Sequence, residues 1–279
     1  MTVPQTEQTS PAATGTPVLE LSDVAVHFGG VKAVDGISLT LHPGLVYGII
    51  GPNGSGKTTL IGAITRLTRL TRGDLRLSGK SYTNRSANEL AGLGVARTFQ
   101  TVRLLPDLDV VQNIRLGFDG RVSANATTAE QPGGRGSWWQ RALGRTAPPE
   151  VADAIARTGL QGFERFYPSE LSYGTQRRVE IARAIAMNPR LLLLDEPTAG
   201  MNQTERAEIS ALMKDLRSQG LCQLLVEHDV QMMIDTCDYV FAMNTGQLIA
   251  QGEPREVVQN PLVQEAYLGR KWREHAADR

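Results

Sequence analysis

The spacing of apolar and polar residues differs between parts of the chain. In the first 100 residues it predicts strands. Between residues 18 and 44 the two kinds alternate, as in VLELSDVAVHF, which is typical of antiparallel strands with one buried face. The continuous apolar run at 45–50, LVYGII, predicts a strand that is buried on both faces. Residues 73–79 and 93–100 predict two further short strands, the second ending at Gln100.

Helical patterns follow from residue 101 to residue 188. Apolar residues recur every third and fourth position in VVQNIRLGF, VADAIARTGL and RRVEIARAIAM, so three amphipathic helices are expected. The range 119–150 is rich in Gly, Ala, Ser, Thr and Pro, and it predicts a long loop or partly disordered insert. Within it, Trp138 and Trp139 are interpreted as covering a neighbouring surface, with a docking helix as the alternative.

After residue 188 strands and helices alternate. LLLLD and CQLLVEH read as strands, and each precedes a helical pattern, TERAEISALMKDLRSQG and VQMMIDTC respectively. This alternation predicts a parallel sheet with crossover helices, hence an α/β fold. The segment YVFAMNTGQLIAQG predicts a hairpin that turns across Asn244 to Gly246.

Composition limits the classes of protein to consider. The chain has 279 residues, and its 29 basic and 29 acidic side chains give a formal net charge of zero, so no global basic field favours nucleic acid as a partner. Cys222 and Cys237 are too few for a disulfide framework and are interpreted as buried or incidental thiols of a reducing compartment. Residues 1–17 read as a disordered lead and not as a signal peptide. No apolar run approaches the ~20 residues of a membrane span. A cytoplasmic protein is expected, which reaches a membrane only through partners.

The strongest motif is GPNGSGKT at residues 51–58, between the buried strand and a helical pattern. Its spacing is that of a phosphate-binding P-loop. Glycines let backbone amides approach a phosphate chain, and the amino end of the following helix favours an anion. Lys57 supplies a point charge, and the Thr58 hydroxyl is a ligand for Mg²⁺. The alternative is a glycine turn that matches by accident. The predicted phosphate ligands are Asn53, Gly54, Ser55, Gly56, Lys57, Thr58 and Thr59.

Two further segments fit this chemistry. LLLLDEP at 191–197 delivers Asp195 and Glu196 at the carboxyl end of a buried strand, where ligands of parallel sheets bind. Asp195 suits Mg²⁺, and Glu196 suits the orientation of water. In LSYGTQRRVEIARAI, Ser172 precedes a helix whose amino end predicts either a second anion site or an ordinary N-cap.

The order of these motifs resembles the ATP-binding subunit of an ABC transporter over residues 18–270. The P-loop resembles Walker A, LSYGT the signature motif, and LLLLDE Walker B. Two departures stand out. In the signature motif, Tyr173 and Thr175 replace the usual glycine and glutamine. In the segment AGMN at 199–202, which resembles the D-loop, Asn202 replaces the usual terminal aspartate. Further matches are Gln100 of RTFQ with the Q-loop, AGMN at 199–202 with the D-loop, His228 of LLVEHD with the switch region, and Phe28 of VHFGG with the adenine-stacking aromatic residue.

A finer resemblance narrows the class. FGGVKAV, ARTFQTVRLLPDLDVVQNI and the closing NPLVQEAYLG resemble the longer ATPase subunit of high-affinity branched-chain amino acid importers. Urea and amide importers share much of this pattern, so they stay open as alternatives.

The resemblance implies a P-loop ABC ATPase cassette. Such a cassette has a mixed or parallel sheet core, an antiparallel β subdomain and an inserted α-helical subdomain. The implied single domain covers 18–270, and a charged tail follows at 271–279. Residues 18–100 and 189–252 are assigned to the nucleotide-binding core, and 101–188 to the helical subdomain.

The resemblance also implies roles and partners. Two cassettes face head to tail, as a homodimer or a heterodimer, and ATP is held between one P-loop and the partner's signature motif. The chain is then peripheral on the cytoplasmic face of the membrane, bound to permease subunits and served indirectly by a solute-binding protein. Phe28 stacks on adenine, and Mg²⁺ is surrounded by Thr58, Asp195 and Gln100. Glu196 activates water, and His228 steadies the γ-phosphate. Ser172 and Gly174 close on the partner's nucleotide.

Three apolar residues precede a proline break and an amphipathic helix, namely Val102, Leu104 and Leu105. They are interpreted as an apolar groove for a permease helix, with Leu104 exposed; the alternative is that they pack the helical core.

Two other classes are considered. The first is a soluble ABC ATPase that acts on ribosomes or DNA. The second is a P-loop kinase or GTPase. A single P-loop, the absence of heptads or a basic patch, and the LSYGT helix argue against both.

Overall fold

The computed structural model describes residues 15–126 and 147–267. Trp138, Trp139 and the charged tail at 271–279 lie outside these ranges, as do the first 14 residues of the lead. The chain divides into two compact units. The first unit consists of Met1–Asn84 and Leu224–Arg279, and the second of Arg85–Gln223.

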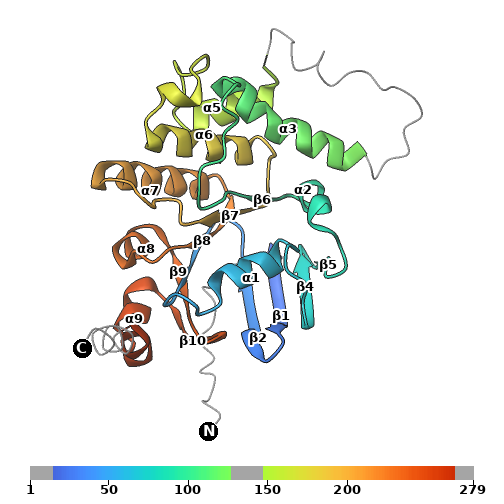
Figure 1. Cartoon of the computed structure of the whole chain (residues 1–279), viewed down its shortest axis with the longest axis vertical. Helices are drawn as coiled ribbons and strands as arrows, with labels where there is room; N and C mark the ends of the chain where they lie inside the picture. Colours follow the sequence, from blue (N-terminus) through green and yellow to red (C-terminus); the bar gives the residue numbers. More distant parts are fainter. Residues whose placement is uncertain (1–14, 127–146, 268–279) are drawn as a thin grey trace. The chain divides into compact units, whose positions relative to one another are not determined.

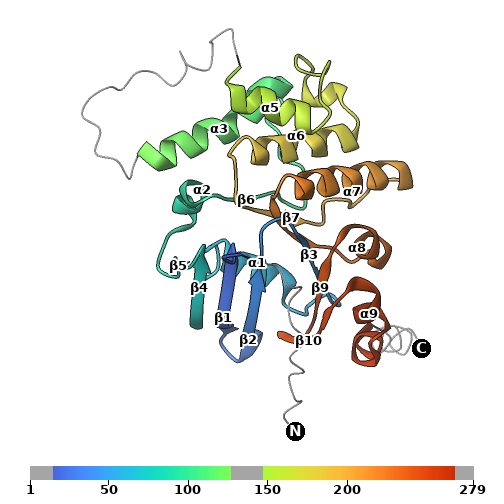
Figure 2. The same cartoon turned by 180° about the vertical axis from the view of Figure 1, so that it is seen from behind.

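In the first unit, one sheet is antiparallel, with the strand order β2-β1-β4-β5. Leu19 of β1 lies opposite Leu41 of β2 and Leu77 of β4, and all three side chains are buried. Both cartoon views show these strands side by side (Figures 1 and 2). The alternating pattern therefore predicted the antiparallel strands correctly. Their bounds are β1 Leu19–Phe28, β2 Val31–Leu41, β4 Arg72–Leu77 and β5 Lys80–Ser81.

The same unit contains the strand that leads into the P-loop. β3 (Val46–Ile50) is buried throughout and pairs in parallel with β9 (Tyr239–Asn244). β9 pairs antiparallel with β10 (Gln247–Gly252), which confirms the expected hairpin. Three helices belong to this unit, α1 Lys57–Ile64, α8 Val230–Thr236 and α9 Pro254–Gln259. β8 (Cys222–Val226) crosses the boundary between the units.

The second unit carries the helices. β6 (Val95–Arg97) and β7 (Leu191–Asp195) pair in parallel. α3, α5 and α6 lie together in both views (Figures 1 and 2), and they are the three amphipathic helices expected from the sequence. The helices are α2 Leu90–Leu93, α3 Val110–Ala126, α5 Pro149–Arg157, α6 Tyr173–Ile185 and α7 Gln203–Ser218, with 3₁₀ turns at Ala87–Glu89 and Pro168–Glu170.

One boundary differs from that expected. α3 continues to Ala126, so the first part of the range 119–150 is helical. Extending a formed helix costs little, and the Arg115–Asp119 ion pair (Nε to Oδ2, 3.6 Å) spans one turn across the expected end.

Two other expectations concern membranes and thiols. Within residues 15–126 and 147–267, no helix is long and apolar enough to cross a membrane. Cys222 and Cys237 are free and buried, as expected. Burial raises the pKa of the Cys222 thiol to about 12, and it also raises the pKa of Cys237.

Candidate nucleotide-binding site

The P-loop joins the end of β3 at Ile50 to the start of α1 at Lys57. Gly56 caps the helix in a left-handed conformation, with φ of 104°. A Cβ atom on Gly56 would lie 2.2 Å from the carbonyl oxygen of Ala33, and one on Gly51 would lie 2.3 Å from that of Met243. Glycine is therefore required at both positions for the loop to pack as it does.

The donors of this loop suit a phosphate chain. The Lys57 side chain folds back over the loop, and its Nζ donates to the carbonyl oxygens of Gly51 (2.7 Å) and Pro52 (3.1 Å). Gly54 and Thr58 are exposed. The Ser55 hydroxyl is buried and has no hydrogen-bond partner among the described residues. A helix amino end, an ammonium group and a buried hydroxyl together fit a polyphosphate anion.

A residue near the end of the described chain also holds the loop. The Tyr267 hydroxyl accepts a hydrogen bond from the Gly51 backbone N–H at 2.8 Å. Tyr267 lies in a helical segment whose described part is 261–267. Burial raises the pKa of Tyr267, so the phenol stays protonated at neutral pH. Sequence reasoning missed this contact, because the two residues are 216 positions apart and no local pattern links them.

Phe28 lies at the tip of the β1–β2 hairpin in the first unit. It pairs with Val31 across the turn, and their exposed fractions are 56% and 64%. Two exposed apolar side chains at a hairpin tip offer a surface for a flat aromatic ligand. The neighbouring His27 is less suited, because its ring is hydrogen-bonded to Asp35 (Nε2 to Oδ1, 3.0 Å).

We expect Phe28→Ala to weaken ATP binding by roughly 1–3 kcal/mol, by analogy with base stacking on aromatic platforms. The ring stacks without reading hydrogen-bonding groups of the base, so ATP and GTP should lose similar affinity. Isothermal titration of both nucleotides measures this, with Leu67→Ala, an exposed apolar residue of the same unit, as the control. An unchanged dissociation constant would place the adenine elsewhere.

His228 lies in the first unit, after the end of β8 at Val226. Its side chain is 61% exposed, and its Nδ1 lies 3.9 Å from Oε2 of the buried Glu227. The next residue, Asp229, caps α8 by accepting hydrogen bonds from the amides of Gln231 and Met232. The ring is thus accessible to a ligand, on a short segment that is fixed at both ends.

The acidic pair lies in the second unit, at the carboxyl end of β7. Asp195 is buried and forms an ion pair with Arg97 of β6 (Nη2 to Oδ2, 2.9 Å). Glu196 accepts a hydrogen bond from Gln100 (Nε2 to Oε2, 2.8 Å). Its φ of 44° lies in the left-handed region, which is uncommon for a residue other than glycine and is often found at functional sites. Sequence reasoning had singled out Gln100 and Glu196 separately, and the structure brings them together.

The signature segment begins α6 of the second unit. Ser172 is its N-cap, and the Ser172 Oγ accepts a hydrogen bond from the Thr175 amide (3.2 Å). The side chain of Gln176, which follows Thr175, is engaged locally, because its Nε2 donates to the carbonyl oxygens of Pro168 and Leu171. Ser172 is exposed, whereas Gly174 is buried.

The D-loop residue Asn202 caps α7. Its Oδ1 accepts from the Glu205 amide (3.0 Å), and the Glu205 carboxylate accepts from the Asn202 amide (3.1 Å). Asparagine and aspartate are about equally good N-caps, so the replacement preserves this local role. A Cβ on Gly174 would lie 3.0 Å from Oε1 of Glu205, so the starts of α6 and α7 are in close contact.

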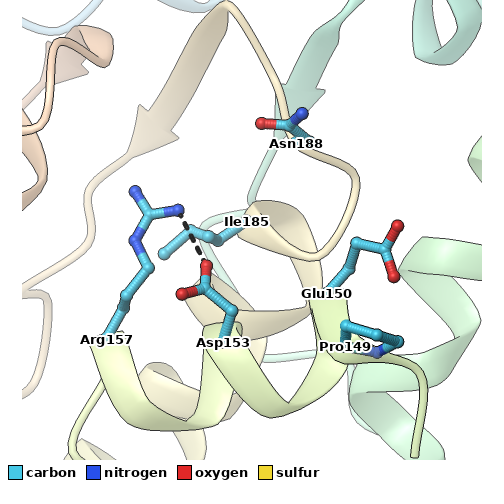
Figure 3. A pocket seen from close by; sticks show the side chains of 6 residues that line it. All are labelled: Pro149, Glu150, Asp153, Arg157, Ile185 and Asn188. Atoms are coloured by element: carbon cyan, nitrogen blue, oxygen red, sulfur yellow. Dashed lines mark hydrogen bonds and ion pairs between the residues drawn. The ribbon is translucent and has the colours of Figure 1, made fainter.

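A surface hollow of about 360 Å³ lies beside α5 and the end of α6 (Figure 3). Asp153 and Arg157, one turn apart on α5, form an ion pair there (3.4 Å). None of the predicted nucleotide ligands lines it. The lining residues are Pro149, Glu150, Asp153, Arg157, Ile185 and Asn188.

The predicted site residues divide between the two units. Phe28, the P-loop and His228 belong to the first unit, and Gln100, Asp195, Glu196, Ser172 and Gly174 to the second. Among the described residues, no three His, Cys, Asp or Glu side chains gather in the manner of a preformed metal cage. That is compatible with Mg²⁺, which usually takes one or two protein oxygens and completes its shell with phosphate and water.

Comparison with known proteins agrees with this chemistry. A family profile described as ABC transporter matches residues 34–199, more than half of the chain. A second profile, described as branched-chain amino acid ATP-binding cassette transporter, matches residues 247–272.

Curated relatives and solved structures are similar over most of the chain. The high-affinity branched-chain amino acid transport ATP-binding proteins BraF of Pseudomonas aeruginosa and LivG of Escherichia coli are 36% and 34% identical to it, and each match covers 91% of this chain and 98% of the relative. The ADP conformation of an ATP-binding cassette of an ABC transporter superposes with a TM-score of 0.77 at 30% identity, covering 91% of this chain and all of that one. The chain therefore belongs to the ABC transporter family, of which it is an ATP-binding, ATP-hydrolysing cassette.

Proposed function

We propose that this cassette powers an importer of branched-chain amino acids. The observation that carries the proposal is the match of residues 247–272 to the cassettes of that transport class, beyond the general ABC transporter match. Tyr267 lies inside this segment and holds the first glycine of the P-loop. The segment that distinguishes the class thus also supports the nucleotide site.

The first unit supplies the nucleotide cradle. Phe28 stacks on the base, and the amides around residues 53–58 bind the phosphates at the start of α1. Lys57 exchanges its contacts with the Gly51 and Pro52 carbonyls for contacts with phosphate oxygens. A phosphate is the stronger acceptor because the hydrogen bond is charge-assisted on both sides. His228 steadies the γ-phosphate.

The second unit supplies the groups for hydrolysis. Glu196 orients the attacking water and takes its proton, and Gln100, which contacts Glu196 at 2.8 Å, senses the γ-phosphate. Thr58, Asp195 and Gln100 are the proposed Mg²⁺ ligands, and when bound the ion neutralises charge that develops on the phosphates. Arg97 holds Asp195 through an ion pair at 2.9 Å, so it must release or share that carboxylate when the metal binds.

These role assignments rest on family membership and on the order of the motifs. A second cassette, identical or different, completes the site with its own Ser172 and Gly174 or their equivalents. Hydrolysis then requires closure of the dimer, which ties chemistry to a rigid-body motion. Integral permease subunits hold the pair at the cytoplasmic face of the membrane, and a solute-binding protein delivers the substrate.

Transport of labelled leucine, isoleucine and valine by the native cell tests the function. Deletion of the gene should abolish high-affinity uptake, and the wild-type gene should restore it while the Glu196→Gln gene does not. Urea and an aliphatic amide are the controls for the related substrate classes. Normal amino acid uptake with loss of urea or amide uptake would overturn the substrate assignment and leave the transporter assignment intact.

An apolar surface of the second unit suits a permease. Leu105 is 48% exposed, while its backbone is fixed by the buried Asn113, whose Oδ1 accepts from the Leu105 amide (2.8 Å). Phe163 and Phe166 are also exposed, with ring centroids 5.5 Å apart, and the Phe166 carbonyl binds the Val110 amide at the start of α3. Contrary to the expectation for Leu104, its side chain is half-buried, and Leu105 is the exposed residue.

Leu105→Glu is therefore expected to leave the isolated subunit folded and able to bind ATP, yet to weaken its assembly with permeases. A charge on an exposed side chain costs little in the free subunit, but it is desolvated when an apolar partner covers it. Pull-down of the membrane subunits measures assembly, and Val122→Glu, at another exposed apolar residue of the same unit, is the control. Normal assembly of the Leu105 variant would move the permease surface elsewhere.

A further inference from the structure

The signature helix α6 carries charged side chains that hold the backbone around Gln100. Arg177 is fully buried, and its guanidinium donates to two successive carbonyl oxygens, Nη1 to Phe99 (2.6 Å) and Nη2 to Gln100 (2.7 Å). Arg183, further along α6, donates from Nη1 to the carbonyl oxygen of Arg103 (2.7 Å). All of these residues lie in the second unit.

Glu180 completes the arrangement. Its Oε2 accepts from Arg177 Nη1 at 2.6 Å, and its Oε1 accepts from the Phe99 amide at 3.4 Å. The Phe99 ring contacts two guanidinium groups, with the Cζ atoms of Arg97 and Arg103 at 5.2 and 4.8 Å from its centroid. The segment from Phe99 to Arg103 is thus held at its backbone and at one side chain.

Stability alone does not explain a buried ion pair at this place. Burial raises the pKa of Glu180 despite its partner Arg177, because desolvation is the largest influence on the carboxyl group. Well-packed apolar residues of similar volume often replace such a pair without loss of stability. What they cannot replace is a planar guanidinium that holds two carbonyl groups in a fixed relative geometry.

The held segment is the one that carries Gln100. With its carbonyl group fixed by Arg177, Gln100 reaches Glu196 at 2.8 Å. Arg177 belongs to the helix α6 that Ser172 caps. One helix therefore links two functional residues. Ser172 caps it, and its buried Arg177 holds the backbone of Gln100, which contacts Glu196.

We propose that Arg177, held by Glu180, is a positioning residue that fixes the backbone of Gln100 for hydrolysis and makes the Gln100 segment move together with the signature helix. This inference rests on the proposed roles of Gln100 and Glu196. Arg177 is fully buried and acts through its contact with the Gln100 carbonyl group.

A double variant separates positioning from stability. Arg177→Met with Glu180→Leu removes both charges of the pair and keeps an apolar filling, so the full chain should still fold cooperatively. Its denaturation midpoint should fall modestly, because Arg183 loses its ion pair with Glu180 (3.7 Å) and the carbonyl oxygens of Phe99 and Gln100 lose their donor. ATP affinity and KM should stay within about twofold, whereas kcat should fall on the order of tenfold or more, since small displacements of reacting groups have large effects on rate. A folded double variant with wild-type kcat overturns the proposal.

A second variant gives a readout that a purely structural role would not change. Lysine keeps the charge opposite Glu180, but its single ammonium cannot reproduce the forked contact with both carbonyl groups. Arg177→Lys should lower kcat in the wild-type background and have no further effect in a Gln100→Ala background, because Arg177 acts through Gln100. Independent, multiplicative effects of the two changes would overturn the proposal, even if the double variant of Arg177 and Glu180 does not fold.

Hydrogen exchange provides a measure that does not depend on activity. Amides of residues 99–103 should exchange faster in Arg177→Lys than in wild type, and unchanged protection would count against positioning. Arg178→Lys, the matched control on the same helix, changes an ion pair with Glu208 and should alter neither exchange nor kcat. If Glu196→Gln hydrolysed ATP normally, the proposed catalytic role would fail, while the exchange result would still report on the Arg177 contact.

Discussion

Glu196→Gln is expected to abolish ATP hydrolysis and to leave Mg·ATP binding close to that of the wild type. Glutamine keeps the size of the side chain and can still bond to Gln100, but its amide oxygen cannot take the proton of the attacking water. Removal of a positioned base costs on the order of a hundredfold or more in rate. The left-handed backbone at Glu196, with φ of 44°, is the same for either residue, so folding should not change.

Phosphate release and nucleotide titration measure the two quantities separately. The variant should also accumulate a closed dimer with ATP, detected by size-exclusion chromatography, because the nucleotide that joins two cassettes is not consumed. Glu208→Gln, an exposed acidic residue of α7 in the same unit, is the control and should hydrolyse ATP normally. A Glu196 variant that turned over at the parental rate would assign the base to another group.

Gly56→Ala is expected to weaken nucleotide binding strongly. A Cβ atom at this position would lie 2.2 Å from the Ala33 carbonyl oxygen, and the backbone φ of 104° is unfavourable for alanine. The P-loop must therefore move away from the β2 backbone, which displaces the amides that bind phosphate. We expect the free energy of unfolding to fall by roughly 2 kcal/mol or more and ATP affinity to fall at least on the order of tenfold.

Gly79→Ala is the matched control for backbone strain. Gly79 also has a positive φ, 76°, but a Cβ atom there meets no atom within 4 Å. The control should lose about 1 kcal/mol of stability and keep the wild-type ATP affinity. Equal loss of affinity in both variants would show that general strain, and not the contact with Ala33, limits binding.

The P-loop and its flanking elements follow from the sequence, because their determinants are local. An apolar run predicts β3, and glycine spacing predicts the loop. The helix-compatible run opens at Gly56, which is the N-cap of α1. The same holds for the β9–β10 hairpin, whose turn residues lie within a few positions of one another. Short-range patterns of this kind act on the chain before any distant segment is in place.

The end of α3 was less predictable from composition. Gly, Ala and Ser beyond Asp119 suggested a loop, yet the helix extends to Ala126. Exposure was equally difficult to assign, since neighbouring apolar residues such as Leu104 and Leu105 differ in burial. Local propensity is a weak preference, and the position of a side chain relative to other elements decides such cases.

The sequence by itself determined the family chemistry of this protein: a strand–loop–helix that binds phosphate, two acids at the end of a buried strand, and the order of the motifs. Only the tertiary structure decided how these groups are held. Tyr267 meets Gly51 across 216 residues, Gln100 meets Glu196 across 96, and Arg177 holds Gln100 across 77. A fully buried arginine in an amphipathic helix has no signature in the local pattern, because its burial depends on carbonyl groups and a carboxylate that folding brings to it.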